Sequence, residues 1–313
     1  YYLEKGLGQK WLAILFALFA AVASFGIGNM VQANSLAEPA EVYFGIPKLV
    51  IGLMMAGLIW LVIIGGIKRI GRVASRIVPI MSVIYIVGAL TVIIMNIDQI
   101  PAAFATIFHH AFNPTSAVGG FTGAAVTATL RFGIARGIFS NEAGLGSAPM
   151  AFAAAKTDEP VREGLVAMIG PLIDTLLICT LTGLVIVTTG AWESGLNSSE
   201  LTAKAFNIGL PGPGGYIVAI SIIFFAFSTA ITWSYYGDRS IKYLFGEKFV
   251  MPYRWLYVLA IPVGASLKID LVWALSDVAN GLMIFPNLIG VLGLSGVVIK
   301  LTKDYFQRQL QES

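Results

Sequence analysis

Long apolar runs recur from one end of the chain to the other, and they constrain its fold more than any other feature. A helix that crosses the hydrocarbon core of a bilayer needs about 20 predominantly apolar residues. Of the 313 residues 57% are hydrophobic and only 12% are charged, whereas a soluble domain carries about 25% charged residues. The sequence therefore predicts an all-α polytopic membrane protein embedded in a lipid bilayer.

Eight apolar segments are long enough to span a membrane. They cover residues 10–34, 46–66, 76–96, 118–152, 164–189, 215–236, 251–266 and 283–300. Fifteen of the 20 lysines and arginines fall at the two ends of the chain and in every second connection between these segments. Cytoplasmic loops of membrane proteins carry an excess of these residues. We therefore expect both ends of the chain to be cytoplasmic.

One polar stretch interrupts the fourth apolar segment. Residues 136–147 contain Arg136, Glu142, three glycines, two serines and an asparagine. Each glycine weakens a helix by about 1 kcal/mol relative to alanine, and charged groups at membrane depth face a cavity or one another. Secondary transporters build substrate and ion sites from helices that are broken in this way. We predict that the helix is broken over residues 137–146.

Asn29 and Gln32 are polar residues of the first segment, and a spacing of three places them on one face of a helix. They either form hydrogen bonds between helices or let Gln32 reach a polar substrate near the middle of the membrane. Asp174 lies near the middle of segment 164–189. A carboxylate at that depth is a functional candidate, and the structural alternative is an ion pair with Arg131 or Arg136.

Hydroxyl groups gather in the sixth segment, where Ser228, Thr229 and Thr232 precede Trp233. Hydroxyls in membrane helices commonly bond to a carbonyl one turn back. The alternative is that their oxygens coordinate a hard cation such as sodium. Because Thr229 and Trp233 are four residues apart, a ligand on one would also touch the other.

Other function classes find little support in the sequence. Cys179 is the single cysteine, and His109 and His110 are adjacent in a polar connection. A catalytic metal site needs more such ligands, so we expect no enzyme and no cofactor. The net charge of +3 suggests no nucleic-acid partner. The polar residues cluster at the middle of the chain's apolar segments, whereas a channel would need them along one continuous path.

Several motifs resemble those of the alanine or glycine:cation symporter family. The most specific is Phe-Ser-Asn-Glu-Ala-Gly-Leu-Gly-Ser-Ala-Pro at residues 139–149, preceded by Arg136 and Gly137. Similar stretches lie at residues 1–8, 28–34, 232–238 and 277–282. The resemblance runs the whole length of the chain.

This resemblance implies a leucine-transporter-like inverted-repeat fold and sodium-coupled uptake of alanine or glycine, with sodium as the coupling ion. Members of the family begin with about three more helices, so we expect the N-terminal part of the first repeat to be missing here and the fragment alone not to transport. Residues 1–96 would be the remainder of the first repeat, 97–117 an outer connecting helix, 118–300 the second repeat and 301–313 a cytoplasmic tail. Aligning Pro79 with Pro286 agrees with such a repeat and makes residues 267–282 an outer surface helix.

Roles for single residues follow as hypotheses within that resemblance. The substrate would be bound by Gln32, Phe139, Ser140, Asn141, Thr229 and Trp233. Sodium would be bound by oxygens of Ser228, Thr229 and Asp174, and Arg136 and Glu142 would form a gating or structural ion pair. The alternative is a proton-coupled amino-acid transporter of the same fold, in which Glu142 or Asp174 titrates. We expect a monomer in the plasma membrane of a prokaryote.

Overall fold

The structure, a computed structural model, describes residues 1–112 and 122–312, and every regular element in these two ranges is helical. The first range contains η1 (Tyr2–Gly6), α1 (Lys10–Phe25), η2 (Gly26–Met30), α2 (Val31–Phe44), α3 (Lys48–Ile63), α4 (Gly66–Met95), η3 (Ile97–Gln99) and α5 (Ile100–Phe112). The second contains α6 (Thr122–Asn141), α7 (Ala148–Phe152), α8 (Pro160–Pro171), η4 (Leu172–Cys179), α9 (Thr180–Thr188), η5 (Ala191–Ser194), α10 (Ser198–Gly209), α11 (Gly214–Phe245), η6 (Glu247–Phe249), α12 (Val250–Ser266), α13 (Ile269–Gly293) and α14 (Ser295–Glu312).

Five of the helical stretches in the described residues are long and apolar enough to cross a bilayer. They are Lys10–Phe44, Gly66–Met95, Pro160–Thr188, Gly214–Phe245 and Asp270–Gly293, and Lys48–Ile63 is a shorter apolar helix. This architecture is consistent with the predicted all-α membrane protein. The count of eight spans stays a prediction.

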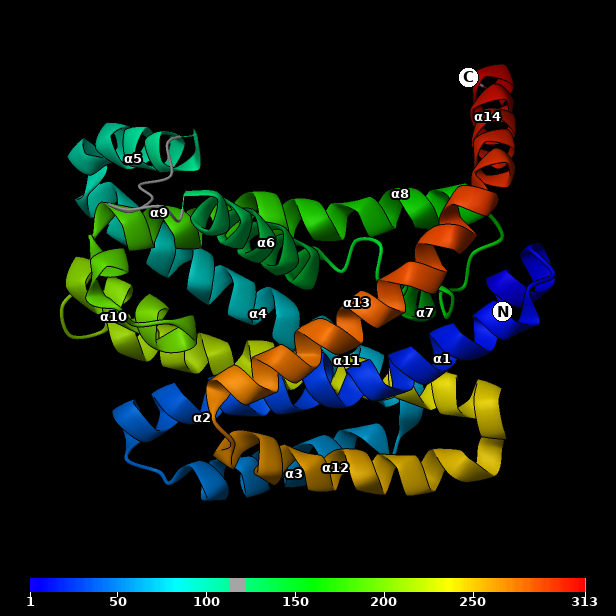
Figure 1. The fold of residues 1–313 in the computed structure, drawn as a ribbon, viewed down its shortest axis with the longest axis horizontal. Coiled ribbons are helices and arrows are strands. Elements are labelled where there is room, and N and C mark those ends of the chain that lie inside the picture. The colour runs from blue at the N-terminus through cyan, green and yellow to red at the C-terminus, as the bar shows by residue number, and fades with distance from the viewer. Residues whose placement is uncertain (113–121, 313) are drawn as a thin grey trace.

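Most of the long helices run roughly along the longest axis of the molecule, and α1 and α2 together extend along it from one end to the other (Figure 1). α1 packs against α11 and α13, α2 packs against α11 and α12, and α3 packs against α12. Along α1 the contacts are made largely by alanines, and Ala13, Ala20 and Ala23 are buried. Small residues let membrane helices approach closely where no water-driven force brings them together. The N-terminus and α14 lie toward the same end of the molecule (Figure 1).

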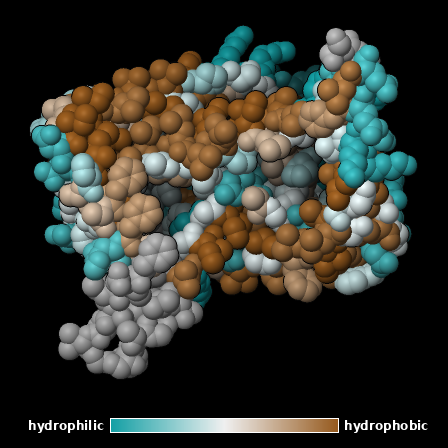
Figure 2. Space-filling model, turned by 90° about the horizontal axis from the view of Figure 1, so that it is seen from above, coloured by the Kyte–Doolittle hydropathy of each residue, from teal (hydrophilic) through white to brown (hydrophobic). Residues whose placement is uncertain are grey.

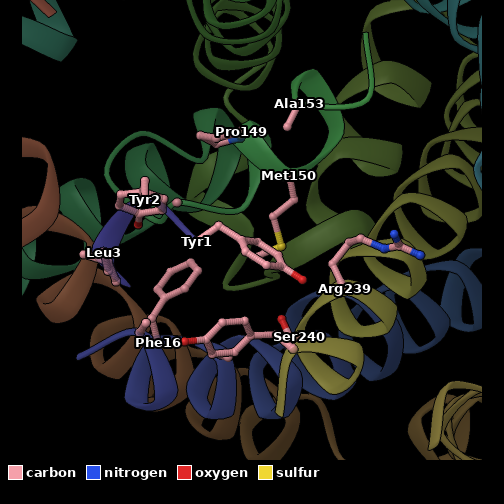
Figure 3. A pocket seen from close by; sticks show the side chains of 13 residues that line it. Tyr1, Tyr2, Leu3, Phe16, Pro149, Met150, Ala153, Arg239 and Ser240 are labelled. Atoms are coloured by element: carbon pink, nitrogen blue, oxygen red, sulfur yellow. The ribbon is translucent and has the colours of Figure 1, made fainter. Parts of the chain in front are cut away.

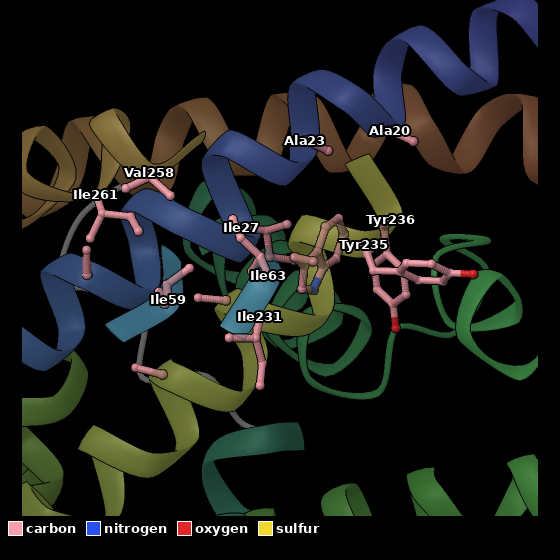
Figure 4. Close-up of a cluster of buried hydrophobic side chains, with 14 of the residues drawn as sticks. Ala20, Ala23, Ile27, Ile59, Ile63, Ile231, Tyr235, Tyr236, Val258 and Ile261 are labelled. Atoms are coloured by element: carbon pink, nitrogen blue, oxygen red, sulfur yellow. The ribbon is translucent and has the colours of Figure 1, made fainter. Parts of the chain in front are cut away.

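Large apolar side chains point both into and away from this bundle. Ile27, Ile59 and Ile231 meet in a buried cluster formed by η2, α3 and α11 (Figure 4). On the outer side of α3, Leu58 and Leu61 are 55% and 62% exposed. Figure 2 shows broad hydrophobic areas on this face of the molecule, with the densest group of hydrophilic residues at its right-hand end and smaller groups elsewhere. A surface of this kind is suited to lipid.

A π-helical turn, η2, separates α1 from α2 inside the longest central helix. Gln32 donates its side-chain amide to the carbonyl of Ile27 at 2.9 Å, and the Tyr257 hydroxyl donates to the carbonyl of Gly28 at 2.9 Å. Gly28 lies against α11, where a Cβ added to it would come within 2.1 Å of the Trp233 Cβ. Only glycine fits this contact. Turns of this type occur frequently at functional sites.

The structure corrects the predicted bounds in two places. Residues 269–293 form one continuous helix and a new helix begins at Ser295, so the predicted span 283–300 is divided at Leu294 and its first half continues the predicted surface helix. Gly293 packs against Leu7 at this point. The second correction concerns the basic connection expected between segments 46–66 and 76–96. Its residues, Arg69 among them, lie on α4 itself, because only Ile64 and Gly65 separate α3 from α4. The predicted connecting helix 97–117 contains α5, and its last residues lie outside the described ranges.

Candidate functional site

The helix that carries the polar stretch ends at Asn141, and the chain is non-helical from Glu142 to Ser147 before α7 begins. The non-helical segment therefore starts five residues later than the predicted Gly137. Asn141 ends the helix by accepting the N–H of Ala143 on its side-chain oxygen at 2.8 Å, a local bond typical of turns. Glu142 has a φ of +55°, in the left-handed region that is uncommon for residues other than glycine.

Two glycines allow the non-helical segment to turn, since Gly144 and Gly146 have φ values of +79° and +80°. Gly146 also lies so close to α13 that a Cβ there would come within 2.6 Å of the Asn287 side-chain oxygen. Asn287 donates its amide to the Gly144 carbonyl at 2.8 Å and accepts the Tyr2 hydroxyl on its oxygen. The segment is thus bound to α13 and, through Asn287, to η1.

On its other side the non-helical segment is bound to α11 through Glu142. One carboxylate oxygen of Glu142 accepts the indole N–H of Trp233 at 3.0 Å, and the other accepts the Ser147 hydroxyl at 2.6 Å. Trp233 and Ser147 are 1% and 0% exposed. This arrangement joins two residues predicted for the site, Glu142 and Trp233, which are 91 positions apart.

The backbone N–H groups of Gly144, Gly146 and Ser147 donate to no acceptor in the described part of the chain. Leu145, which lies between them, does donate its N–H to the Glu142 carbonyl at 3.2 Å. Successive backbone N–H groups in a turn can bind a negatively charged group. The segment therefore offers free donors beside a buried tryptophan.

Arg136 forms an ion pair with Asp277 on α13. The predicted ion pair between Arg136 and Glu142 is therefore wrong. The Arg136 guanidinium also lies 4.3 Å from the ring centroid of Trp273, a distance at which cation–π attraction acts. Phe139 stacks on the same Trp273 ring, with 4.8 Å between centroids. These four residues form a connection between α6 and α13 one to two turns before the non-helical segment.

Ser140 and Asp174 meet between α6 and the π-helical element η4. The Ser140 hydroxyl donates to the Asp174 carboxylate and lies 3.2 Å from the Cys179 sulfur. The Thr175 hydroxyl also donates to Asp174, at 3.2 Å. Asp174 forms no ion pair within the described residues. The predicted alternative of a pair with an arginine is therefore not what the structure shows.

Two of the three α11 hydroxyls, those of Ser228 and Thr232, make the local carbonyl bonds that were one of the two interpretations of the sequence. Ser228 donates to the Phe225 carbonyl at 3.0 Å and Thr232 donates to the Ser228 carbonyl at 2.9 Å. Their oxygens keep lone pairs that can still accept a cation. Thr229 lies between them, one turn before Trp233.

Two cavities flank these connections. The first, of about 300 Å³, has a largely apolar lining that includes Phe16, Gly146 and Met150 (Figure 3). The second, of about 770 Å³, has a mixed lining that includes the charged residues Arg131, Arg136 and Asp277. Within the described part of the chain, neither cavity is lined by Trp233, Asn141 or Gln32.

Sequence reasoning missed three residues that the structure brings to this region: Ser147, Asp277 and Asn287. Asp277 could have been found by the rule that pointed to Asp174, since it is also a carboxylate in an apolar helix. Ser147 lies within the stretch that was singled out, but its bond to Glu142 depends on the shape of the turn. No cluster of three histidine, cysteine or acidic side chains that could hold a metal occurs among the described residues.

Comparison with known proteins agrees with the motifs. The model of the sodium:alanine symporter family matches residues 1–313. The sodium/alanine symporter AgcS of Methanococcus maripaludis is 46% identical over 321 residues, which cover 100% of this chain and 70% of AgcS. The probable sodium/glutamine symporter GlnT of Bacillus subtilis is 40% identical over 99% of this chain and 64% of its own length.

A third relative differs in the coupling ion that its description gives. The putative sodium/proton-dependent alanine carrier protein YrbD of Bacillus subtilis is 37% identical over 99% of this chain and 67% of its own length. The full-length match of the family model and the identity to these relatives lead to one conclusion. The chain belongs to the sodium:alanine symporter family.

Proposed function

We propose that this protein carries out secondary active transport of small neutral amino acids, alanine and glycine, coupled to sodium by alternating access. The observation that carries the proposal is the non-helical segment from Glu142 to Ser147, with unpaired N–H groups beside the buried Trp233. An amino-acid zwitterion needs donors for its carboxylate, and broken membrane helices supply them in transporters. Membership of a symporter family supports this use of the segment.

In this proposal the carboxylate of the substrate binds the free N–H groups, while Asn141 and Ser140 hydrogen-bond the zwitterion and Gln32 reaches it from α2. Phe139 and Trp233 limit the volume for the substrate side chain. A pocket without spare volume rejects larger side chains sterically. Alanine and glycine fit such a pocket.

Sodium is bound in this proposal by the oxygens of Ser228 and Thr229, with Asp174 as a further candidate. Arg136 and Asp277 hold α6 to α13 as a gating or structural pair. The inverted repeat, the eight spans, the monomeric state and a plasma-membrane location with both ends cytoplasmic belong to the same proposal. The N-terminus and α14 lie toward the same end of the molecule's long axis (Figure 1), which supports the proposal that both chain termini are on one side of the membrane.

The test is uptake of labelled alanine into proteoliposomes that contain the protein expressed from its complete reading frame. We expect uptake to follow an imposed sodium gradient at constant pH and to stop when choline replaces sodium. Equal rates of alanine uptake in sodium and in choline would contradict the proposed sodium coupling. An excess of unlabelled glycine should compete with alanine, and glutamine should compete less.

Site variants carry the test to single residues. Asn141→Ala and Trp233→Ala should raise the KM for alanine, because each removes a proposed contact with the substrate. Asn96→Ala and Trp255→Ala are matched controls: the Asn96 side-chain amide donates to the carbonyl of Val92 at the end of α4, and Trp255 is 49% exposed on α12. Controls that change KM as much as the site variants would argue against this site.

Proton coupling is the second candidate. Glu142 and Asp174 are carboxylates in apolar surroundings, and neither forms an ion pair within the described residues. A carboxylate without a cationic partner is costly at membrane depth unless it binds a proton or a cation. Uptake driven by a pH gradient in the absence of sodium would favour this candidate.

A further inference from the structure

The Glu142 carboxylate links two elements that the chain connects only over a long distance. It is the first residue of the non-helical segment, and it accepts the Trp233 indole N–H from α11 on one oxygen, at 3.0 Å. Its other oxygen accepts the hydroxyl of Ser147 at 2.6 Å, which closes the segment on itself. A single side chain therefore fixes both the shape of the segment and its position relative to α11.

Glu142 has no cation to satisfy it in the described residues. The nearby Arg136 is committed to Asp277, and the salt bridges of the described chain do not include Glu142. Hydrogen bonds to an ionised acceptor are shorter and stronger than neutral ones. The two bonds to Trp233 and Ser147 are thus the interactions that hold this carboxylate in place.

Three contacts hold Trp233 in place, and only one of them, the hydrogen bond to Glu142, depends strongly on the orientation of the indole ring. Gly28 of η2 lies against its Cβ, and Tyr236 meets its ring edge-on with 5.2 Å between centroids. Both contacts are steric or dispersive, so they tolerate small rotations of the ring. The hydrogen bond from the indole N–H to Glu142 fixes the rotation.

We propose that Glu142 is a positioning residue that sets the orientation of the Trp233 indole and makes it move together with the non-helical segment. This inference rests on the proposed function insofar as Trp233 limits the substrate pocket. If the two site elements are joined at Glu142, losing the bond loosens the pocket and weakens substrate binding. Glu142 itself does not touch the substrate.

The variants separate hydrogen bonding from packing. Glu142→Ala removes both acceptors, whereas Glu142→Gln keeps one carbonyl oxygen for the indole and an amide that can donate to the Ser147 oxygen. Trp233→Phe removes the donor and leaves the non-helical segment intact. Ser234→Ala is the matched control for Ser147→Ala, because Ser234 is equally buried and its hydroxyl bonds to the Ile231 carbonyl of its own helix.

The first measurement is the KM and the maximal rate of sodium-driven alanine uptake. We expect Glu142→Ala and Trp233→Phe each to raise KM roughly tenfold, the size expected for losing a hydrogen bond to a charged group. Glu142→Gln should stay within about threefold of the unchanged protein, and Trp233→Phe should add little in the Glu142→Ala background. Additive effects of the two substitutions, or a KM that neither one changes, would overturn the proposal.

The second measurement does not depend on transport. In a variant whose other five tryptophans are phenylalanine, the fluorescence emission and acrylamide quenching of Trp233 report its surroundings directly. Glu142→Ala and Ser147→Ala should shift both signals, and Glu142→Gln and Ser234→Ala should leave them near the starting values. Unchanged Trp233 fluorescence in Glu142→Ala would overturn the positioning role. A clear shift in a protein that takes up no alanine would support the positioning role and remove the proposed function.

Discussion

Replacing Gly28 by alanine tests the contact on which the position of Trp233 depends. A Cβ at residue 28 would lie 2.1 Å from the Trp233 Cβ and 2.3 Å from its Cγ, whereas ordinary van der Waals contact begins at 3.4 Å. The backbone of α11 fixes the position of the Trp233 Cβ, so a change of rotamer cannot relieve the 2.1 Å contact. Either η2 and α11 move apart by about 1 Å or the indole is displaced from Glu142.

The size of the effect follows from two opposing terms. Overpacking of this kind costs about 3 kcal/mol, the upper end of the usual range, because backbone has to move. Alanine favours a helix over glycine by about 1 kcal/mol. The net loss for Gly28→Ala is therefore about 2 kcal/mol, roughly a thirtyfold change in an equilibrium constant. Gly57→Ala is the matched control, since nothing lies within 4 Å of a Cβ at that exposed position of α3.

The assay is unfolding of the purified protein in detergent by titration with sodium dodecyl sulfate, followed by circular dichroism. We expect Gly28→Ala to be less stable than the unchanged protein and Gly57→Ala to be as stable or slightly more so. The KM for alanine should rise only in Gly28→Ala. If the two variants agree in stability within about 0.5 kcal/mol, the spread of neutral surface substitutions, the close contact does not constrain the protein.

Three further predictions concern other polar contacts. Arg254→Ala should lower the stability by about 3–5 kcal/mol in the same titration, because it leaves the carboxylate of Asp238 buried without its partner, and replacing both residues by apolar ones should cost much less. Asn287→Ala should cost about 1–3 kcal/mol, because the Gly144 carbonyl loses its donor. Ser228→Ala should raise the sodium concentration needed for half-maximal uptake, whereas unchanged sodium dependence would leave its hydroxyl with a structural role, bonded to the Phe225 carbonyl and the Met81 sulfur.

The apolar pattern predicted most of the helices because burial in lipid or against other helices needs nothing more than a long run of apolar residues. It could not place the end of α13, since residues 283–300 are apolar enough to continue past Gly293. That helix ends where Gly293 meets Leu7, a contact between residues 286 positions apart. The pattern also placed Arg69 outside α4, which begins at Gly66, because charge alone does not distinguish a loop from the end of a long helix.

Within the candidate site, the composition of residues 136–147 predicted a loss of helical structure, and the chain is non-helical from Glu142 to Ser147. That α6 and α7 form one interrupted membrane span stays a prediction. The start of the interruption at Glu142 depends on the bonds that its carboxylate makes to Trp233 and Ser147, and these come from the fold. The ion-pair partner of Arg136 could not be predicted from the sequence either, because it depends on which helix packs beside α6. A charge in an apolar helix indicates that a partner exists, and the packing of α6 against α13 decides that the partner is Asp277.

The side-chain amide of Asn287 bridges Tyr2 and Gly144, and it can do so in only one orientation. Its nitrogen faces the Gly144 carbonyl and its oxygen faces the Tyr2 hydroxyl, so rotating the amide by half a turn would oppose like groups at Gly144. A tilt of α13 that separates it from Gly144 must break the Asn287–Gly144 hydrogen bond, and it must then either break the Tyr2–Asn287 bond or move η1 together with α13. The surface turn η1 would then act as an external indicator of rearrangements deep in the bundle, and a probe attached beside Tyr2 would register them.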